Sequence, residues 1–358
     1  MDTLLIFREV SDDALTRIKK SFSTVYYFPN PTPEQVDDTK LKDVDAIFMN
    51  WSGLPDDVVP SFKKTPKLKF LQLPSAGSER AVKAKAFQEQ VEKGKQGEFE
   101  VKLCNASGIH VTSIPQWCIG QTISLLHQTQ KMIVYAHERK TWGKKDMKGP
   151  FGEKSYYSRD VAGKTIGFLG YGTLGRETAR LFKPFLVDVI AANSSGKATK
   201  DTGYIMPGTG DIDGSIPSEF FATTDDSSFN EFLKRSDILI CSLPSTSKTK
   251  FLLTKERLAL LPKGGLLLNV GRGDLFRSED LLDALDDNLS GAALDVTDPE
   301  PLSDGHPLWT HPNVIVTPHI SGNAESEGEH AVDLLLQNAK RFVEEKEFFN
   351  VVDIEKGY

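Results

Sequence analysis

Three polar residues that could carry out proton transfer and anion binding each follow an apolar, strand-like segment. Arg272 comes just after the run at 265–270, and Glu300 and His319 follow two later runs. Because α/β sheets bind ligands at the carboxyl ends of parallel strands, we expect these side chains to converge. The histidine can protonate a carbonyl oxygen, the glutamate can orient it, and the arginine can grip a carboxylate. Singly, each residue has a structural alternative, such as an Arg–Glu ion pair or a capping histidine.

A glycine-rich turn, GYGTLG at 170–175, directly follows a predicted strand at 165–169 and opens a predicted helix through Phe182. This is the context in which the Gly-x-Gly-x-x-Gly pattern binds a dinucleotide. The first glycine allows the tight turn, the second lets the backbone approach a pyrophosphate, and the third lets helix and strand pack closely. The free N–H groups of the helix N-terminus favour an anion. The predicted contacts are Gly170, Gly172, Thr173, Leu174 and Gly175.

The end of the next strand bears on the choice between the two nicotinamide dinucleotides. NAD-binding proteins place an acidic residue about 20 residues beyond the glycine motif, on the ribose hydroxyls. This chain has ANSSGK at 192–197 and no carboxylate. Asn and Ser can donate hydrogen bonds to a 2′-phosphate, and lysine can neutralise it, which favours NADPH over NADH. The alternative is an ordinary turn in a site that accepts either cofactor, NAD included. The candidate contacts are Asn193, Ser194, Ser195 and Lys197, with Lys200 as a second lysine.

Two α/β domains are expected to position these residues, because the chain has 358 residues and domains average roughly 100–200. In the first third, strand-like runs alternate with helix-like stretches and predict a small parallel layer. After Lys164, six strand candidates alternate with helices and predict a doubly wound sheet. Long helices are predicted over 114–136 and 327–346. The polar stretch 194–226 is predicted to be an elaborated surface loop, unusually long for a βα connection.

Composition and charge limit the partners and the location. The formal net charge of −7 gives no electrostatic reason to expect nucleic acid or an anionic membrane. No apolar run reaches the ~18 residues of a membrane span, and the N-terminus lacks the features of a secretory signal. Cys104, Cys118 and Cys241 have no paired or metal-binding spacing, so we predict buried free thiols and no metal site. Together these features predict a cytoplasmic protein.

The segment 163–322 resembles the D-isomer-specific 2-hydroxyacid dehydrogenase family through several motifs in the same order. The motifs are GKTIGFLGYGTLGRETA, SDILICSLPSTSKT, LLPKGGLLLNVGRGDLF, GAALDVTDPEPL and HPLWTHPNVIVTPHISG. The first third matches more loosely, through LKFLQLPSAGSE. The resemblance implies a Rossmann doubly wound domain at 112–323 that binds the dinucleotide. It also implies a smaller flavodoxin-like α/β substrate domain, made of 1–111 and 324–358, and a homodimer.

The resemblance assigns roles to individual residues. The catalytic residues it implies are Arg272, Glu300 and His319, and Arg272 also binds the substrate. The residues whose backbone N–H groups hold the substrate carboxylate are Ser75, Ala76 and Gly77. Asp295 is implied to lie near the nicotinamide amide. The remaining implied cofactor contacts are Leu243, Pro244, Thr249 and Val270.

The expected activity is NADPH-dependent reduction of a small 2-oxo acid to the D-2-hydroxy acid. Glyoxylate and hydroxypyruvate are favoured, because NADPH suits a reductase. A larger 2-oxo acid is the alternative if aromatic residues line a roomier pocket, the candidates being Trp51, His110, Trp117 and Trp309. Formate dehydrogenases share the fold but carry an amide in place of the catalytic glutamate, so Glu300 argues against that activity. The alternative from another class is a nucleotide-sensing corepressor, a binding protein on the same fold.

Overall fold

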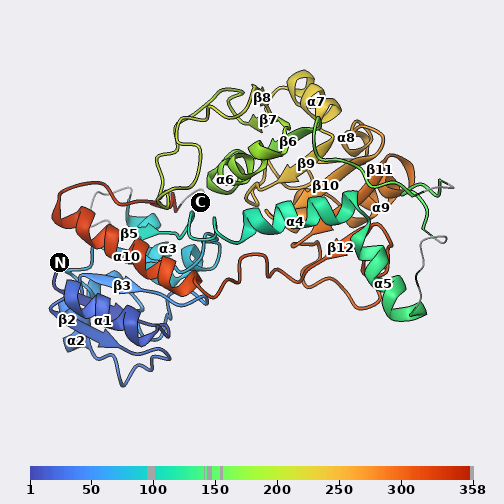
Figure 1. Cartoon of the computed structure of the whole chain (residues 1–358). Helices are drawn as coiled ribbons and strands as arrows, with labels where there is room; N and C mark the ends of the chain where they lie inside the picture. Colours follow the sequence, from blue (N-terminus) through green and yellow to red (C-terminus); the bar gives the residue numbers. More distant parts are fainter. Residues whose placement is uncertain (95–100, 141, 143–146, 154–155, 355–358) are drawn as a thin grey trace. The chain divides into compact units, whose positions relative to one another are not determined.

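The computed structural model describes residues 1–94, 101–140, 142, 147–153 and 156–354 (Figure 1). The chain divides into two compact units. Unit 1 comprises Met1–Ile109, Thr202–Tyr204 and Ala324–Tyr358, and unit 2 comprises His110–Asp201 and Ile205–Asn323. The assignment of substrate binding to one domain and cofactor binding to the other stays a prediction.

Unit 1 contains a five-stranded sheet in which every paired strand is parallel, in the order β2-β1-β3-β4-β5. This is the flavodoxin-like order, as predicted. The strands are β1 (Thr3–Ile6), β2 (Thr24–Tyr27), β3 (Ala46–Phe48), β4 (Phe70–Gln72) and β5 (Lys102–Cys104). The helices are α1 (Asp12–Ser21), α2 (Asp38–Asp43), α3 (Lys85–Gly94) and α10 (Glu327–Val343). Residues 95–100, which follow α3, lie outside the described residues.

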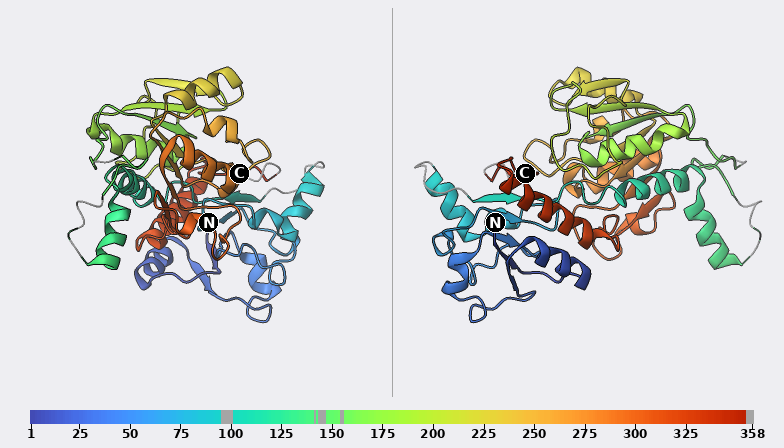
Figure 2. Two further views of the ribbon diagram at one scale, coloured as in Figure 1. Left: turned by 90° about the vertical axis from the view of Figure 1, so that its right-hand side faces the viewer. Right: turned by 60° about the vertical axis from the view of Figure 1, so that its left-hand side comes forward.

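The last helix of the chain belongs to the first unit. Helix α1 begins where the Ser11 hydroxyl accepts a hydrogen bond from the Ala14 N–H, which satisfies one of the free donors at a helix start. Helix α10 lies beside α1 in both Figure 1 and Figure 2. Arg17 of α1 pairs with two carboxylates of α10, those of Glu329 (3.0 Å) and Asp333. Residues far apart in the sequence therefore complete unit 1.

Unit 2 contains a seven-stranded sheet of parallel pairs in the order β12-β11-β10-β9-β6-β7-β8. The strands are β6 (Thr165–Leu169), β7 (Asp188–Asn193), β8 (Glu219–Ala222), β9 (Ile238–Cys241), β10 (Gly265–Asn269), β11 (Leu289–Leu294) and β12 (Val314–Val316). The helices are α4 (Ile114–Leu126), α5 (Thr129–Arg139), α6 (Thr173–Phe182), α7 (Asp226–Arg235), α8 (Lys255–Leu258) and α9 (Ser278–Asp287). The predicted doubly wound α/β sheet is confirmed.

Both faces of this sheet are buried, because successive side chains of a strand point to opposite faces. Ile166 and Phe168 of β6 share one core cluster with residues of α4 and α6. Leu239 and Cys241 of β9 share another cluster with residues of α7, α8 and α9. A parallel sheet covered by helices on both faces accounts for the continuously apolar strands in the sequence.

Two predictions about unit 2 were wrong in detail. The stretch 194–226, predicted to be a surface loop, contains β8, whose Phe221 is buried and which pairs with β7. The strand was not predicted because it is only four residues long and lies within a polar stretch. The helix predicted over 114–136 is two helices, because Gln128 between them has φ +50°, and a left-handed residue ends an α-helix.

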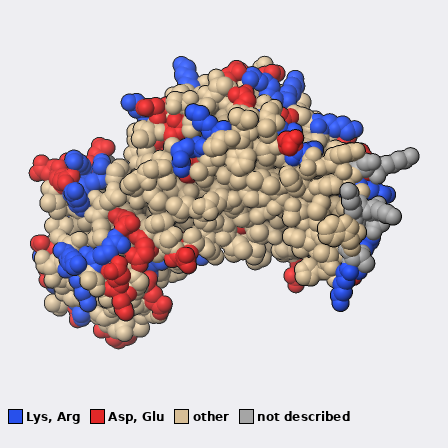
Figure 3. Space-filling model, viewed as in Figure 1, with Lys and Arg blue, Asp and Glu red and all other residues tan. Residues whose placement is uncertain are grey.

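The surface and the cysteines bear on the remaining compositional predictions. On the face shown in Figure 3, basic side chains are interspersed with acidic ones. Across the described ranges, no helix combines the length and the hydropathy that crossing a membrane requires. The three cysteines are free and buried, as predicted, and burial raises the pKa of each thiol.

Candidate active site

The glycine motif forms the turn between β6 and α6. Gly170 has φ +94°, a conformation that residues with a side chain rarely adopt. A Cβ atom at Gly175 would lie 2.6 Å from the Gly170 carbonyl oxygen, so only glycine lets the helix approach the turn. A Cβ at Gly172 would meet nothing within 4 Å. The first and third glycines are therefore required by the backbone, while the second leaves open space beside the turn.

This turn fits the pyrophosphate of a dinucleotide. Helix α6 begins after Gly172, and among the described residues no side chain caps its N-terminus. The open space beside Gly172 and the uncapped N–H groups of α6 belong to the same turn, and such N–H groups attract an anion. The loop after β9 closes over the same turn, since the Ser242 hydroxyl donates to the Gly170 carbonyl (3.1 Å). Within that loop the Thr249 hydroxyl donates to the Pro244 carbonyl (2.7 Å), and Leu243 packs against Gly170.

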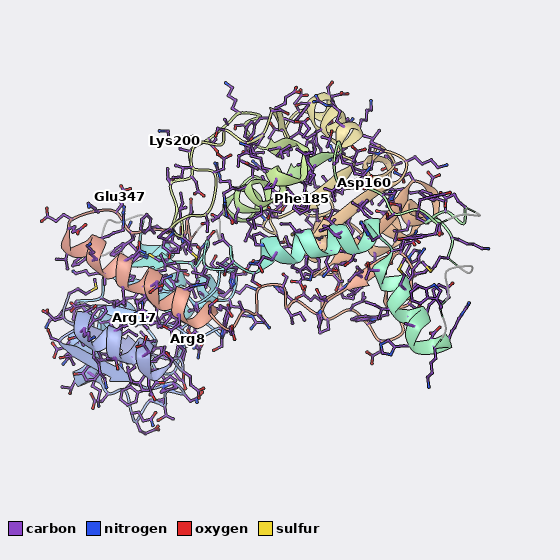
Figure 4. All side chains as sticks on the ribbon, viewed as in Figure 1. Arg8, Arg17, Asp160, Phe185, Lys200 and Glu347 are labelled. Carbon is purple, nitrogen blue, oxygen red and sulfur yellow. The ribbon has the colours of Figure 1, made fainter. Side chains whose placement is uncertain are left out.

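The residues after β7 form a closed turn. The Asn193 side-chain oxygen accepts the N–H groups of Ser195 (3.0 Å) and Gly196 (2.7 Å), and its amide donates to the Lys197 carbonyl (2.9 Å). The Asn193 side chain is therefore occupied in shaping the turn, whereas Ser194, Ser195 and Lys197 are exposed. The alternative lysine, Lys200, lies on the outer side of its loop and pairs with Asp213 at 3.5 Å (Figure 4).

Arg272 lies in the turn after β10, which a buried asparagine organises. The Asn269 side-chain oxygen accepts the Gly271 N–H (3.1 Å), and its amide donates to the Arg272 carbonyl (2.9 Å). The next residue, Gly273, packs directly against the chain that leads to Glu300, because a Cβ there would lie 1.9 Å from the Thr297 carbonyl oxygen. The turn that carries Arg272 therefore has almost no freedom to shift.

His319 and Glu300 form a hydrogen-bonded pair at the ends of β12 and β11. The His319 Nδ1 atom lies 2.6 Å from the Glu300 Oε1 atom. Their side chains are 54% and 43% exposed, so a ligand can reach both. His319 has φ +55°, a left-handed conformation that is uncommon outside glycine and often marks a functional site. Because β10, β11 and β12 are neighbours in the sheet, all three predicted catalytic residues come from adjacent strand ends.

Sequence reasoning missed the residues that hold this site in shape. From the sequence, no role was assigned to Asn269, Thr317 or Ser321. The Thr317 and Ser321 hydroxyls both donate to the carboxylate of Asp295, each at 2.5 Å. Short polar residues that flank a candidate catalytic residue were the available signal, since their side chains commonly bond nearby backbone and turns.

The predicted substrate-carboxylate loop lies in unit 1, after β4. The Ser75 hydroxyl donates to the Gly77 carbonyl (2.8 Å), and the Ser75 carbonyl accepts the Ala106 N–H (2.7 Å). Ala76 is exposed at the tip. The loop is thus a short, internally bonded turn. In the part of the chain that the structure describes, no cluster of three or more His, Cys, Asp or Glu side chains is arranged to hold a metal ion.

Comparison with known proteins agrees with this geometry. Residues 119–321, more than half of the chain, match the family model described as "D-isomer specific 2-hydroxyacid dehydrogenase, NAD binding domain". An uncharacterized protein from the proB 3′ region of Corynebacterium melassecola is 31% identical over 91% of this chain and 93% of its own length. The glyoxylate reductase of Thermococcus kodakarensis is 25% identical over 95% of this chain and 92% of its own length.

Solved structures show the same fold. The NADPH-dependent glyoxylate/hydroxypyruvate reductase of Sinorhizobium meliloti, solved with NADP and sulfate, superposes with a TM-score of 0.72 at 24% identity and covers 100% of both chains. The assignment to a family rests on the family model, which covers more than half of the chain. The chain belongs to the D-isomer-specific 2-hydroxyacid dehydrogenase family, whose members use a nicotinamide cofactor.

Proposed function

We propose that the protein reduces a small 2-oxo acid to the D-2-hydroxy acid with NADPH. The observation that carries the proposal is the hydrogen-bonded pair of His319 and Glu300, 2.6 Å apart and half-exposed, at strand ends adjacent to that of Arg272. A proton donor, its orienting carboxylate and an anion-binding cation are the groups that carbonyl reduction requires. The glyoxylate and hydroxypyruvate reductases among the relatives support a small substrate.

In the proposed reaction the chain's own residues hold the acid and supply a proton. The backbone N–H groups of Ser75, Ala76 and Gly77, with the Arg272 guanidinium, bind the substrate carboxylate. Glu300 accepts from Nδ1 of His319 and thereby orients the ring, so that Nε2 delivers a proton to the 2-oxo oxygen. A bound dihydronicotinamide supplies the hydride that adds to C2. The carbonyl thus gains a hydride and a proton and becomes an alcohol.

For the cofactor, the proposal assigns the glycine turn to the pyrophosphate and the turn after β7 to the 2′-phosphate of NADPH. The remaining cofactor contacts are Leu243, Pro244, Thr249, Val270 and Asp295. At the turn after β7, Ser194, Ser195 and Lys197 are exposed and no carboxylate is present to repel a phosphate. Lys197 is favoured over Lys200, which pairs with Asp213.

The first test is the initial rate of NADPH and NADH oxidation with glyoxylate, hydroxypyruvate and larger 2-oxo acids. We expect a preference for NADPH and for the small acids. Lys197→Ala should raise KM for NADPH several-fold while leaving KM for NADH unchanged, and Lys200→Ala is the matched control with no effect on either. A preference for NADH would overturn the cofactor assignment. A higher rate with a branched or aromatic 2-oxo acid would overturn the assignment of a small substrate.

His319→Ala tests the chemistry. The variant should lose about 10²–10⁴ in turnover, the usual contribution of general acid catalysis, and should still bind NADPH in a fluorescence titration. Full activity would exclude the proposed role. If the unsubstituted protein binds NADPH tightly but reduces no acid of the panel, the nucleotide-sensing binding protein on this fold becomes the better interpretation.

The proposal includes a homodimer in the cytoplasm. No residue of helix α5 is fully buried, and Ile133 and Val134 are 54% and 52% exposed. A helix of 11 residues is marginal in water unless another surface covers it, and we assign that surface to a second copy. Light scattering should give a dimer for the wild type and a monomer for Ile133→Asp/Val134→Asp. A monomeric wild type would exclude this part of the proposal.

A further inference from the structure

Three neighbouring strands of unit 1 end in one row, and the turn after each carries a residue able to meet a ligand. The sheet aligns the last residues of β1, β3 and β4 with one another. Arg8, Trp51 and Ser75 follow these strand ends within three residues. Neighbouring strands lie about 4.8 Å apart, so the ends of β1 and β4 are roughly 10 Å apart. Arg8 and the loop proposed for the substrate carboxylate therefore belong to one edge of the sheet.

The side chain of Arg8 extends over the end of β3. Its guanidinium carbon lies 5.2 Å from the centre of the Phe48 ring and 5.7 Å from that of the Trp51 ring. A cation within about 6 Å of an aromatic ring is attracted to it, so these two rings hold the guanidinium in place. Strand β3 lies between β1 and β4 in the sheet. Arg8 thus leans from its own strand in the direction of the loop after β4.

One nitrogen of the Arg8 guanidinium, Nη1, is buried and has no hydrogen-bond partner within the described part of the chain. Arg8 lies beside the start of α10 (Figure 4), where Glu327 is its acidic neighbour. Burial lowers the pKa of Arg8 and raises the pKa of Glu327, and the attraction between the two charges only partly opposes each shift. A buried donor without a partner costs free energy. A ligand atom that accepts a hydrogen bond from Nη1 would remove that cost.

We propose that Arg8 selects the substrate of the reductase. Its Nη1 atom donates a hydrogen bond to an acceptor carried on C3 of a 2-oxo acid whose carboxylate lies at the loop Ser75–Gly77. The hydroxyl of hydroxypyruvate and the second carboxylate of oxaloacetate are two acceptors of this kind, and a guanidinium binds either. Glyoxylate has no C3 and gains nothing from this contact. The inference rests on the proposed function, because it names which 2-oxo acids that reaction favours.

The test compares acids that differ only in the acceptor. Hydroxypyruvate is paired with pyruvate, and oxaloacetate with 2-oxobutyrate, in which a methyl group replaces the second carboxylate. We expect the wild type to have the higher kcat/KM for the acid with the acceptor in at least one pair. Arg8→Met, which keeps an apolar side chain of similar length, should lower that ratio about ten-fold or more, the contribution of one charge-assisted hydrogen bond. Its kcat/KM for glyoxylate should change little.

Arg17→Met is the matched control. Arg17 is another partly buried arginine of unit 1 beside α10, but it pairs with the carboxylates of Glu329 (3.0 Å) and Asp333. Its loss should leave both substrate ratios unchanged. If Arg8→Met does not fold, Arg8→Lys takes its place, because lysine keeps the charge but lacks the planar fork of the guanidinium; it should lower the same ratio by a smaller factor. An equal loss of rate with all five acids would show a structural role for Arg8 and overturn the inference.

The two pairs also distinguish the two acceptors. A ratio that falls only for hydroxypyruvate and pyruvate identifies a hydroxyl, and one that falls only for oxaloacetate and 2-oxobutyrate identifies a carboxylate. Unchanged ratios in a folded Arg8→Met variant would overturn the inference and leave the reductase assignment standing.

If the wild type reduces no acid, the proposed function fails and binding replaces rate as the measurement. Calorimetry with NADP⁺ present then compares D-glycerate with D-lactate and D-malate with D-2-hydroxybutyrate. Tighter binding of the first member of either pair by the wild type, lost in Arg8→Met, would support the contact of Arg8 without the reaction. Equal binding within both pairs would exclude that contact as well.

Discussion

Two regions of unit 2 are each organised by one buried aspartate, yet they present opposite surfaces. In the turn at 317–321, Asp295 bonds Thr317, Ile320 and Ser321 and leaves the His319 imidazole half-exposed. The other region lies between β7 and β8 and comprises the unit 2 residues 194–201 and 205–218, which we call the insertion. Here Asp211 accepts from Ser215, Ile216 and Tyr171. The turn around the first aspartate leaves an imidazole exposed to solvent, whereas the second aspartate bonds a polar segment to the rest of the unit.

The insertion is fastened to the glycine motif and to α6. Tyr171, within the motif, donates to Asp211 at 2.9 Å. Arg176 is 3% exposed and donates to the carbonyls of Asp211 (2.5 Å) and Thr199 (2.7 Å). The Gly210 N–H donates to Glu177 (2.6 Å). A buried polar network of this kind costs much free energy when it is broken. Similar buried aspartates therefore hold the turn of the proposed catalytic histidine in one region and attach a polar insertion in the other.

The largest effect in this comparison is expected on kcat/KM, when the turns that carry the proposed catalytic residues are displaced. In Gly273→Ala the new methyl group would meet the Thr297 carbonyl oxygen at 1.9 Å, so the turns that carry Arg272 and Glu300 must separate. A displacement of about 1 Å can cost ~100-fold in rate, and we expect kcat/KM to fall at least that much. The control is Gly120→Ala in α4, where a Cβ meets nothing within 4 Å. Equal rates for the two variants would contradict the rigid positioning.

The next effect is expected on stability, when the hydrogen bonds of Arg176 to the insertion are removed. Arg176→Met should lower the free energy of unfolding of unit 2 by about 3 kcal/mol, because it leaves buried carbonyls without donors. The kcat of the protein that remains folded should change little. Urea unfolding followed by fluorescence measures the first quantity. Lys200→Met, in the same insertion but 78% exposed at its side chain, should cost less than about 0.5 kcal/mol. Similar losses of unfolding free energy in both variants would show that Arg176 does not attach the insertion firmly.

The smallest effect is a pH dependence at Asp211. Burial opposes ionisation of this carboxyl, but the hydrogen bonds from Ile216, Ser215 and Tyr171 outweigh burial and lower its pKa. A group whose pKa is lower in the folded state stabilises the fold above its unfolded pKa of about 3.9 and loses that contribution as the pH falls. The difference in melting temperature between the wild type and Asp211→Asn should therefore be larger at pH 7 than at pH 3. A constant difference would show that the charge is irrelevant.

The sequence predicted the α/β fold and its two parallel sheets, because short, continuously apolar runs and a glycine turn are local signals. It also singled out His319 and Glu300, which the structure brings together. It did not predict the contacts of Asp295, because those depend on Ile320 and Ser321, which follow the neighbouring strand β12 about 25 residues later. Nor did it predict that Arg176 and Asp211 bind the insertion. Long-range hydrogen bonds between polar residues leave no periodic pattern, and a polar stretch with one short strand such as β8 looks like a loop.

The discontinuous make-up of unit 1 has a consequence for the order of events during synthesis. Its five strands emerge from the ribosome first, yet its core includes Val352, and the Asn338 amide donates to Gln72 at 2.9 Å. The strands of unit 1 therefore lack part of their core until the residues of unit 2 have been translated. Because domains generally fold as units once their residues are available, unit 2 reaches its native state first. The strands of unit 1 therefore expose apolar surface for longer during synthesis than those of unit 2, and such exposure favours aggregation.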